Sequence, residues 1–322
     1  MYFFSVVIPV YNRPDEIDEL LNSLTAQTYT NFEVIIVEDG STDKCDHLME
    51  KYTGELRLQY FFKPNTGQGF SRNYGFEKSK GDYFIVFDSD CIIPSHYFEV
   101  VNNFLTETPL DAFGGPDKAL SSFTATQRAI SYSMTSFFTT GGIRGGKKRL
   151  GPFHPRSFNM GISKAVFKET SGYVITRMGE DIEFSIRIIE KGFKTGLIPE
   201  AYVYHKRRTT LAQFYKQLKF FGRARINVGR FYPKEVKLVH IFPMLFALGI
   251  PAIFLLGLTG LKALSFAGLA SYITFCILIF LDSWIKNRSL KVAFISVPAA
   301  FTQLIAYGNG FITEGVRRLI KG

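Results

Sequence analysis

The sequence predicts an α/β domain built on a parallel sheet, followed by a basic segment and by apolar helices suited to a membrane. Three observations support this division. Strand and helix patterns alternate through the first third of the chain, basic charge is concentrated in residues 206–237, and long uncharged runs follow residue 240. We therefore expect a folded domain over 1–205, a basic amphipathic segment over 206–237 and a membrane domain over 238–322.

Four short apolar runs in the first 90 residues are typical of buried strands. They are separated by stretches long enough for helices, of which Ile17–Leu24 is the clearest because its apolar residues recur at helical spacing. Further helices are expected from a cap at Ser41 or Thr42 to Tyr52, and over Phe70–Ser79. This alternation indicates parallel strands covered on both faces. The expected strands are Phe3–Val10, Phe32–Val37, Leu56–Phe62 and Tyr83–Phe87.

The region from Phe113 to Tyr204 has weaker periodicity and ends in a short strand, Ala201–Tyr204. It contains a glycine-rich basic stretch, Gly141–Arg149. The simple interpretation is a surface loop. The alternative is a flexible flap over a ligand, because this composition permits motion and contacts to phosphate.

The formal net charge of the chain is +10, but its distribution argues against binding to nucleic acid. Residues 1–205 carry 21 basic and 25 acidic side chains, whereas residues 206–237 carry 10 basic and 1 acidic. The excess charge borders the apolar C-terminal part, where anionic lipid head groups would attract it. No base-reading motif accompanies this charge, so we expect a membrane partner and no nucleic-acid partner.

The three cysteines, Cys45, Cys91 and Cys276, are far apart and form no CxxC pair. This spacing indicates neither a disulfide framework nor a zinc site, and it suits a reducing compartment. The apolar start of the chain lacks a basic region before it, so it predicts a first strand and not a signal peptide. The expected location is the cell (inner) membrane, with the N-terminal domain facing the cytoplasm.

Three uncharged runs in the C-terminal part are each long enough to cross a bilayer as a helix: 241–261, 263–281 and 292–313. Buried helices of a soluble protein are the alternative. One residue cannot connect two full spans, so the first two runs predict a hairpin with a turn near Thr259-Gly260. Basic residues follow both the second and the third run, which favours a re-entrant or interfacial third segment.

Polar side chains follow each expected strand, at the edge of a parallel sheet where ligands bind. Tyr11 can stack on a planar base, and the carboxylate of Asp39 can accept a hydrogen bond from a uracil-type N–H. Arg72 opens a helix and can hold a base or a phosphate. The fourth strand leads directly into Asp88-Ser89-Asp90. Two carboxylates at this spacing repel each other unless a cation bridges them, and oxygen ligands suit Mg²⁺ or Mn²⁺.

These motifs together resemble glycosyltransferase family 2. The resemblance rests on Val6–Asn12, Val37–Asp43, Ser71–Asn73 and Asp88–Asp90, and it covers about the first two-thirds of the chain. It implies the GT-A fold, which is Rossmann-like, together with inversion at the anomeric carbon and use of a divalent metal. It also implies base contacts from Asp39 and Arg72, a ribose or metal contact from Asp88 and a metal contact from Asp90. Pro9, Tyr11, Asn12 and Lys63 complete the predicted nucleotide-binding set.

A second acidic motif, Glu180-Asp181, precedes a helical pattern and matches the family's position for the catalytic base. Inversion needs a base that reaches the acceptor hydroxyl, and Asp181 is the predicted residue, with Glu180 as a secondary candidate. The alternative is structural, because acidic residues in the first turn of a helix favour its dipole.

His205 follows the last short strand and is a candidate metal ligand or diphosphate contact, although a lone histidine is more often structural. The stretch from Gln213 to Arg225 mixes aromatic and basic residues. It predicts an amphipathic helix on a membrane surface, and Arg223 or Arg225 could also contact a diphosphate or an acceptor. Together with Tyr232-Pro233 and the late Tyr307–Phe311, this stretch resembles the succinoglycan-biosynthesis subgroup of the family. No QxxRW motif is present, so transfer of a single sugar is preferred over polymer synthesis.

The combined expectation is transfer of one sugar from a nucleotide-diphosphate donor, a UDP-sugar by preference, to a membrane-associated lipid-linked or glycolipid acceptor. Two alternatives stay open: a polyprenyl-phosphate glycosyltransferase, whose phosphate acceptor needs less help from a base, and a membrane scaffold that has lost catalysis. The sequence leaves open the sugar, the acceptor, the linkage and the oligomeric state.

Overall fold

The computed structural model describes residues 1–141 and 153–321 and divides the chain into two compact units. The first comprises Met1–Lys118 and Gly151–Lys206, and the second comprises Ala119–Leu150 and Arg207–Gly322. The expected N-terminal domain of 1–205 thus differs in one respect, since Ala119–Leu150 is grouped with the C-terminal part. Residues 142–149 of the glycine-rich stretch lie outside the described residues.

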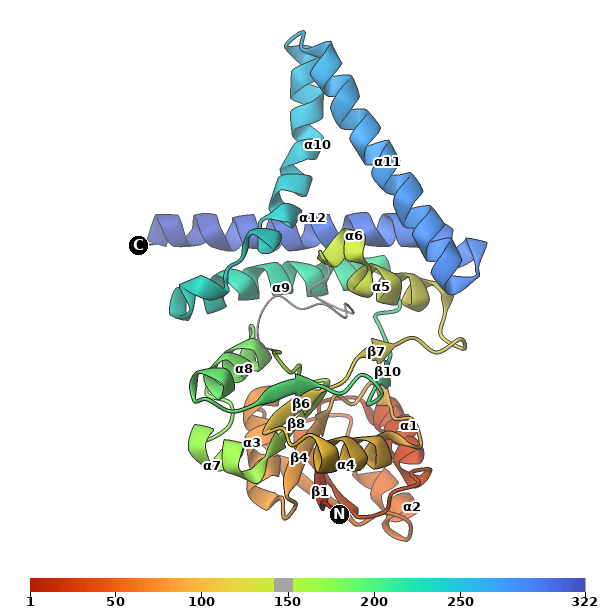
Figure 1. The fold of residues 1–322 in the computed structure, drawn as a ribbon, viewed down its shortest axis with the longest axis vertical. Coiled ribbons are helices and arrows are strands. Elements are labelled where there is room, and N and C mark those ends of the chain that lie inside the picture. The colour runs from red at the N-terminus through yellow and green to blue at the C-terminus, as the bar shows by residue number, and fades with distance from the viewer. Residues whose placement is uncertain (142–152, 322) are drawn as a thin grey trace. The chain divides into compact units, whose positions relative to one another are not determined.

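The first unit is built on a mixed sheet whose described strands follow the order β3-β2-β1-β4-β8-β6-β9 (Figure 1). Strands β1 to β4 are mutually parallel, as the βαβ pattern predicts, and β8 is antiparallel to its neighbours β4 and β6. Their bounds are β1 Phe4–Val10, β2 Phe32–Asp39, β3 Leu58–Lys63, β4 Tyr83–Phe87, β6 Ala112–Gly114, β8 Asn159–Ser163 and β9 Thr195–Leu197.

Helices cover both faces of this sheet, and alternation along β1 shows how the core is divided. Val6 and Ile8 point into a cluster with residues of α1 and α4, whereas Val7 points into a cluster with residues of α3 and α8. The helices of this unit are α1 Pro14–Thr25, α2 Met49–Thr53, α3 Gln68–Lys78, α4 Tyr97–Glu107, α7 Lys164–Thr170 and α8 Glu180–Glu190, with a 3₁₀ turn at Asp46–Leu48.

The first strand ends at Val10, as expected, although Pro9 lies within it. Strand β4 pairs only with Phe4–Val7, so the missing N–H of Pro9 interrupts no bond on that side. The helix expected from Ser41 or Thr42 to Tyr52 is wrong. Only the short helix α2 forms, after a 3₁₀ turn, because the Ser41 and Thr42 side chains bond to Asn12 instead of capping a helix.

A small second sheet in the same unit has the described order β5-β10-β7. Its strands are β5 Cys91–Ile92, β7 Asp117–Lys118 and β10 Val203–His205. The antiparallel register places His205 opposite Cys91, directly after the Asp88–Asp90 turn. A short strand late in the sequence therefore returns His205 to the end of β4, where the acidic pair lies.

The second unit is helical throughout its described residues. Helices α9 and α12 pack along each other, and α10 and α11 form a hairpin beside them (Figure 1). Helix α5 joins this unit because Ala129, Ile130 and Met134 pack against Phe214 and Leu218 of α9. The bounds are α5 Ala125–Thr135, α6 Phe137–Thr140, α9 Leu211–Phe231, α10 Phe242–Leu258, α11 Lys262–Asn287 and α12 Leu290–Lys321, with 3₁₀ turns at Pro233–Glu235 and Leu238–His240.

Among the described residues, two helices are long and apolar enough to cross a membrane, α11 and α12. They differ in exposure: 6% of the most apolar window of α11 is buried, against 44% for α12. Helix α10 is apolar but shorter, at 17 residues. The three expected apolar segments are thus all helical, and the outer surface of α11 is the one most suited to hydrocarbon.

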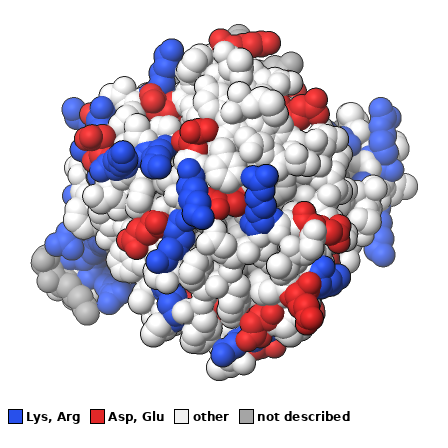
Figure 2. All heavy atoms as spheres, turned by 90° about the horizontal axis from the view of Figure 1, so that it is seen from below, with Lys and Arg blue, Asp and Glu red and all other residues white. Residues whose placement is uncertain are grey.

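Charged side chains on the face that looks down in Figure 1 are mixed in sign. Figure 2 shows this face, where basic and acidic groups are interspersed and do not gather into one basic patch.

The contact between α9 and α12 depends on glycine. A Cβ atom at Gly222 would lie 2.1 Å from the Tyr307 carbonyl oxygen, whereas a Cβ atom at Gly315 of α12 would meet nothing within 4 Å. We predict that Gly222→Ala lowers the free energy of unfolding by about 1–3 kcal/mol through forced separation of the helices. The matched variant Gly315→Ala should be neutral or gain up to about 1 kcal/mol. Thermal unfolding of the full chain in detergent measures both, and equal effects would contradict the packing argument.

Candidate active site

The loop after β2 is organised around the carboxylate of Asp39. Its Oδ2 accepts a hydrogen bond from the Gly67 N–H at 2.8 Å, and its Oδ1 accepts one from the Thr66 N–H at 2.9 Å. Lys63 forms an ion pair with the same carboxylate and also donates to the Pro64 carbonyl and to Thr66. Burial by itself would raise the pKa of Asp39, but these donors hold it below its ordinary value.

Asp39 and Lys63 therefore act mainly on each other. Asp39 is 3% exposed, and the ammonium of Lys63 makes three hydrogen bonds within the loop. Both were predicted to contact a nucleotide. In this structure they set the shape of the loop between β3 and α3, on which any such contact would depend.

Asn12 joins the end of β1 to the loop after β2. Its side-chain oxygen accepts hydrogen bonds from the N–H groups of Thr42 and Asp43, at 2.8 and 3.0 Å, and its own N–H donates to Ser41. Asn12 has φ +52°, a conformation that asparagine tolerates better than most residues. The neighbouring Tyr11 is 52% exposed, so its ring is available for stacking.

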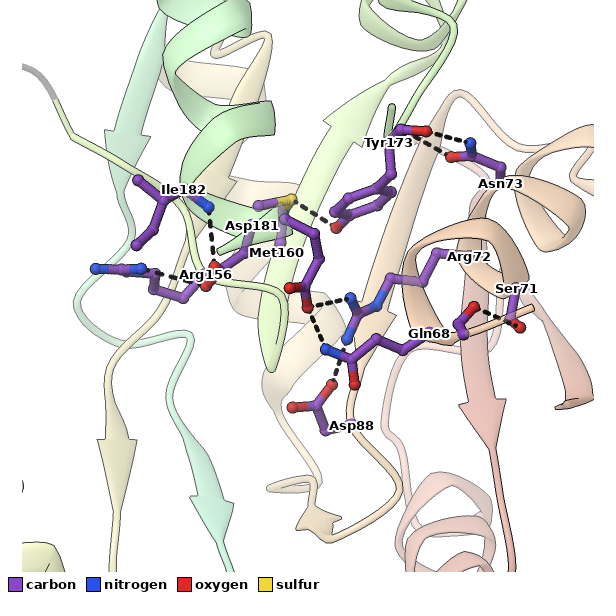
Figure 3. Close-up of polar contacts among 12 residues, drawn as sticks. Gln68, Ser71, Arg72, Asn73, Asp88, Arg156, Met160, Tyr173, Asp181 and Ile182 are labelled. Atoms are coloured by element: carbon purple, nitrogen blue, oxygen red, sulfur yellow. Dashed lines mark hydrogen bonds and ion pairs between the residues drawn. The ribbon is translucent and has the colours of Figure 1, made fainter. Parts of the chain in front are cut away.

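Arg72 is the buried centre of the site. Its guanidinium is 1% exposed and forms ion pairs with Asp88 at 2.9 Å and Glu180 at 3.4 Å. The Tyr173 ring lies 5.4 Å from the guanidinium carbon. Burial opposes the charge, but the surrounding acidic groups raise the pKa of Arg72 overall, so it stays a cation. Figure 3 shows Arg72 pointing toward Asp88.

Glu180, the secondary candidate for the base, is buried beside Arg72. It is 5% exposed, and it accepts a hydrogen bond from the Gln68 side chain. Burial raises its pKa, and the adjacent Asp181 charge raises it further, while Arg72 lowers it. Because it faces inward, Glu180 connects the start of α8 to α3 and does not offer its carboxylate to an acceptor.

Asp181 lies in the first turn of α8, after Gly179, whose φ of +100° reverses the chain. Its Oδ1 accepts a hydrogen bond from the Ile182 N–H at 2.8 Å, and its Oδ2 lies 3.3 Å from Nη1 of Arg156 (Figure 3). The Asp181 side chain is 21% exposed. Asp181 thus lies where an acidic side chain favours the helix dipole. Its side chain is also partly exposed to solvent.

Asp90 and His205 form the site best suited to a metal. His205 Nε2 lies 3.0 Å from Asp90 Oδ1, and Arg13 approaches the other carboxylate oxygen at 3.7 Å. Cys91 is close enough to be a third ligand, but burial raises the pKa of its thiol well above the ordinary value. Its thiol donates to the Phe158 carbonyl oxygen instead. The carboxylate suits Mn²⁺ or Mg²⁺, and the imidazole is a common ligand of transition-metal ions, so these residues fit a divalent metal and favour Mn²⁺ over Mg²⁺.

The other predicted residues make contacts of their own within the protein. Asp88, a predicted metal ligand, gives one oxygen to Arg72. Arg223 pairs with Glu314 of α12 at 3.1 Å, and Arg225 donates to the Glu235 carbonyl oxygen at 3.4 Å. Both arginines belong to the second unit, where they connect α9 to its neighbours. Pro9 contributes only backbone, within β1.

Sequence reasoning missed Arg156, Gln68 and Tyr173. Arg156 forms an ion pair with Asp181, Gln68 donates to the Glu180 partner of Arg72, and Tyr173 lies beside the Arg72 guanidinium. No spacing rule connects these residues to the acidic motifs, because Arg156 precedes β8 and Tyr173 follows α7. Only the fold brings them to the site.

Comparison with models of protein families shows which family the chain belongs to. The model for glycosyl transferase family 2 matches residues 5–171, just over half of the chain. The chain belongs to this family. The family match includes Asp39, Arg72, Asp88 and Asp90 and ends before Asp181. The resemblance predicted from the strand-end motifs is confirmed.

A relative with a glycosyltransferase name supports the same assignment. This uncharacterized glycosyltransferase of Rickettsia bellii is 40% identical over 103 residues, which are 32% of this chain and 15% of that protein. The chain therefore matches only a small part of that longer relative.

Two solved structures confirm the expected GT-A fold. PcManGT, a mannosyltransferase of Pyrobaculum calidifontis solved with GDP-Man and Mn²⁺, is similar over 93% of this chain and 87% of that chain, with a TM-score of 0.66 and 13% identity. Residues 1–349 of TarS of Staphylococcus aureus, solved with UDP-GlcNAc, are similar over 70% of this chain and 67% of that one, with a TM-score of 0.52 and 23% identity.

The lowered pKa of Asp39 makes a testable contribution to stability. We predict that Asp39→Asn lowers the free energy of unfolding by about 1–3 kcal/mol near pH 7. The pKa is lower in the folded than in the unfolded state, so the contribution is complete above the unfolded value near 3.8 and is lost as the pH falls through the folded value. The difference from wild type should therefore shrink below about pH 3.8. Urea unfolding across this range measures it.

The matched control is Asp43→Asn, because Asp43 is an exposed carboxylate in the same loop region. It should change stability by less than about 0.5 kcal/mol at any pH. A loss in Asp39→Asn that stayed constant down to pH 2 would show that the charge of Asp39 does not matter.

Proposed function

We propose that the protein is an inverting, metal-dependent glycosyltransferase that moves one sugar from a nucleotide-diphosphate donor to a lipid-linked acceptor at a membrane. The observation that carries the proposal is the buried guanidinium of Arg72. It contacts Asp88 at the end of β4 and Glu180, the neighbour of Asp181, at the start of α8. The Arg72 side chain thus connects the Asp88–Asp90 turn, on the donor side, to the residue that precedes the predicted base.

On the donor side, the exposed ring of Tyr11 is available to stack on the base of the nucleotide. The loop that Asp39 and Lys63 hold is proposed to offer backbone groups to the base. Asp88, which pairs with Arg72, is proposed to contact the ribose. A UDP-sugar is the preferred donor, and the fold relationship to structures solved with UDP-GlcNAc and with GDP-Man supports a nucleotide-diphosphate sugar.

Asp90 and His205 are the residues proposed to hold a divalent metal, Mn²⁺ or Mg²⁺. When bound, such an ion would neutralise the charge that develops on the diphosphate as it leaves. Arg13, 3.7 Å from Asp90, adds a fixed positive charge on the same side.

On the acceptor side, Asp181 is proposed to take the proton from the attacking hydroxyl group. The Ile182 N–H donates a hydrogen bond to one carboxylate oxygen, and Nη1 of Arg156 lies 3.3 Å from the other. A base must be held in this way within reach of the acceptor hydroxyl. The hydroxyl oxygen then bonds to the anomeric carbon from the face opposite the diphosphate. The bond from that carbon to the diphosphate oxygen breaks, so the configuration inverts.

The second unit is proposed to hold the enzyme at the membrane, with the first unit facing the cytoplasm. Helix α11 supports this because it is long and apolar and only 6% of its most apolar window is buried. Basic residues in α9 and just before it would meet anionic head groups. Confining enzyme and acceptor to one surface raises their effective concentration.

Arg156 gives specific support to the alternative of a phosphate acceptor, as in a polyprenyl-phosphate glycosyltransferase. A guanidinium beside Asp181 would attract a phosphate group, and a phosphate oxygen is already ionised when it attacks. The two alternatives differ in how much the reaction needs Asp181.

The metal site is tested by binding. We predict that His205→Ala and Asp90→Ala each remove most of the thermal stabilisation that UDP-GlcNAc or GDP-Man gives in the presence of Mn²⁺, because each variant deletes one proposed ligand. The control His47→Ala alters an exposed histidine and should behave as wild type. Absence of stabilisation in the wild type by any nucleotide sugar with Mn²⁺ would support a scaffold without catalysis.

The proposed base is tested by turnover. We predict that Asp181→Asn reduces sugar transfer at least 100-fold while donor binding is kept, because asparagine cannot accept the proton. The control Asp15→Asn removes an exposed acidic residue from the first turn of α1 and should keep full activity. Radiolabelled sugar transferred to extractable lipid is the measurement. A rate for Asp181→Asn within about threefold of wild type would favour a phosphate acceptor.

A further inference from the structure

An apolar groove lies in the second unit, between helices α9, α11 and α12. Its volume is about 520 Å³, and it is a shallow depression that is largely open to the surface. One wall comes from α12, one from Cys276 of α11 and one from Tyr215 of α9. The lining residues are Tyr215, Cys276, Val297, Pro298, Phe301, Thr302 and Ile305.

The two hydroxyl groups of the lining are engaged within the protein. Thr302 Oγ1 donates to the Pro298 carbonyl oxygen at 2.8 Å, and the Tyr215 hydroxyl oxygen accepts from Asn309 Nδ2 at 2.9 Å. The remaining lining is aliphatic, aromatic or sulfur. A polar ligand would lose its bonds to water here without replacement, so the groove favours hydrocarbon.

The surroundings of the groove indicate where such hydrocarbon comes from. Cys276 lies near the middle of α11, of whose most apolar window only 6% is buried. The opposite side of the groove is formed by α9, which is not a candidate span and carries Lys216 and Lys219 within one turn of Tyr215. The groove thus extends from a helix suited to the bilayer interior to a basic helix suited to anionic head groups.

We propose that this groove binds the hydrocarbon tail of the lipid-linked acceptor. The inference rests on the proposed function and adds a second binding site to it. A peptide is a poor occupant, because its backbone N–H and C=O groups would lack partners in an apolar groove. A lipid with an apolar tail and an anionic head matches both ends of the groove. In the sequence, α9 begins six residues after His205, so the segment that forms the groove directly follows a proposed metal ligand.

The proposal can be tested by filling the groove with larger side chains. Val297→Trp and Thr302→Trp place large side chains into it, and the matched variants Leu269→Trp and Ile277→Trp add the same side chain to exposed positions on α11. Each full-length variant is placed in phosphatidylcholine nanodiscs with a 16-carbon alkyl phosphate that carries a photoreactive diazirine. After irradiation, mass spectrometry locates the labelled residues.

We predict that wild type is labelled between Val297 and Ile305 and that groove filling reduces this labelling at least fivefold, while the α11 variants do not. A phosphatidylcholine with the same diazirine in its chain should label this stretch several-fold less than the alkyl phosphate. Equal labelling by the two probes would assign the groove to bulk lipid and overturn the proposal, as would labelling that groove filling leaves unchanged.

A second readout separates this inference from the proposed function. Donor binding with Mn²⁺ should be unchanged in the groove-filled variants, while transfer of sugar to lipid-extractable product falls at least tenfold. If the wild-type protein does not bind a donor with Mn²⁺, the proposed function is wrong. The labelling result would then still test whether the groove binds the alkyl phosphate. Full transfer to lipid by both groove-filled variants, with labelling abolished, would show that the acceptor tail binds elsewhere.

Discussion

The active site depends on a positive charge that is removed from water. Arg72 is almost completely buried, and a buried guanidinium is tolerated only when anionic partners compensate for its lost hydration. Asp88 and Glu180 supply that compensation, with the Tyr173 ring beside them. Because these partners come from β4, α8 and the segment after α7, their pairing with α3 fixes the acidic turn and the start of α8 relative to each other.

The carboxylates of the site divide into two kinds according to their surroundings. Asp39 and Glu180 are enclosed by donors from the protein and shape the loops around them. Asp90 and Asp181 are partly open, with side-chain exposures of 13% and 21%. Only the second kind can touch a metal or an acceptor directly. The proposed reaction therefore assigns chemistry to Asp90 and Asp181 and positioning to the other two.

In the second unit, close helix packing and buried ion pairs determine which apolar helix surface stays exposed. Gly222 and Gly310 allow α9 and α12 to approach closely, and Glu314, which is buried, pairs with Arg223 and Arg318 where these helices run together. This packing covers part of α12 and leaves α11 exposed. The proposed tail groove is a consequence, since it forms where these helices do not close against one another.

The order of strands and helices in the first 90 residues, the family and the strand-end acidic residues follow from the sequence, because apolar periodicity and short motifs are local. The side chains that contact those acidic residues cannot be predicted from the sequence in the same way. His205 reaches Asp90 through a three-residue strand, Arg156 reaches Asp181 across two elements, and Glu180 turns inward although it adjoins Asp181. Ser41 and Thr42 look like helix caps locally but bond to Asn12 in the fold. Which carboxylates are buried and which stay open is decided only by contacts between distant segments, and these the tertiary structure alone determines.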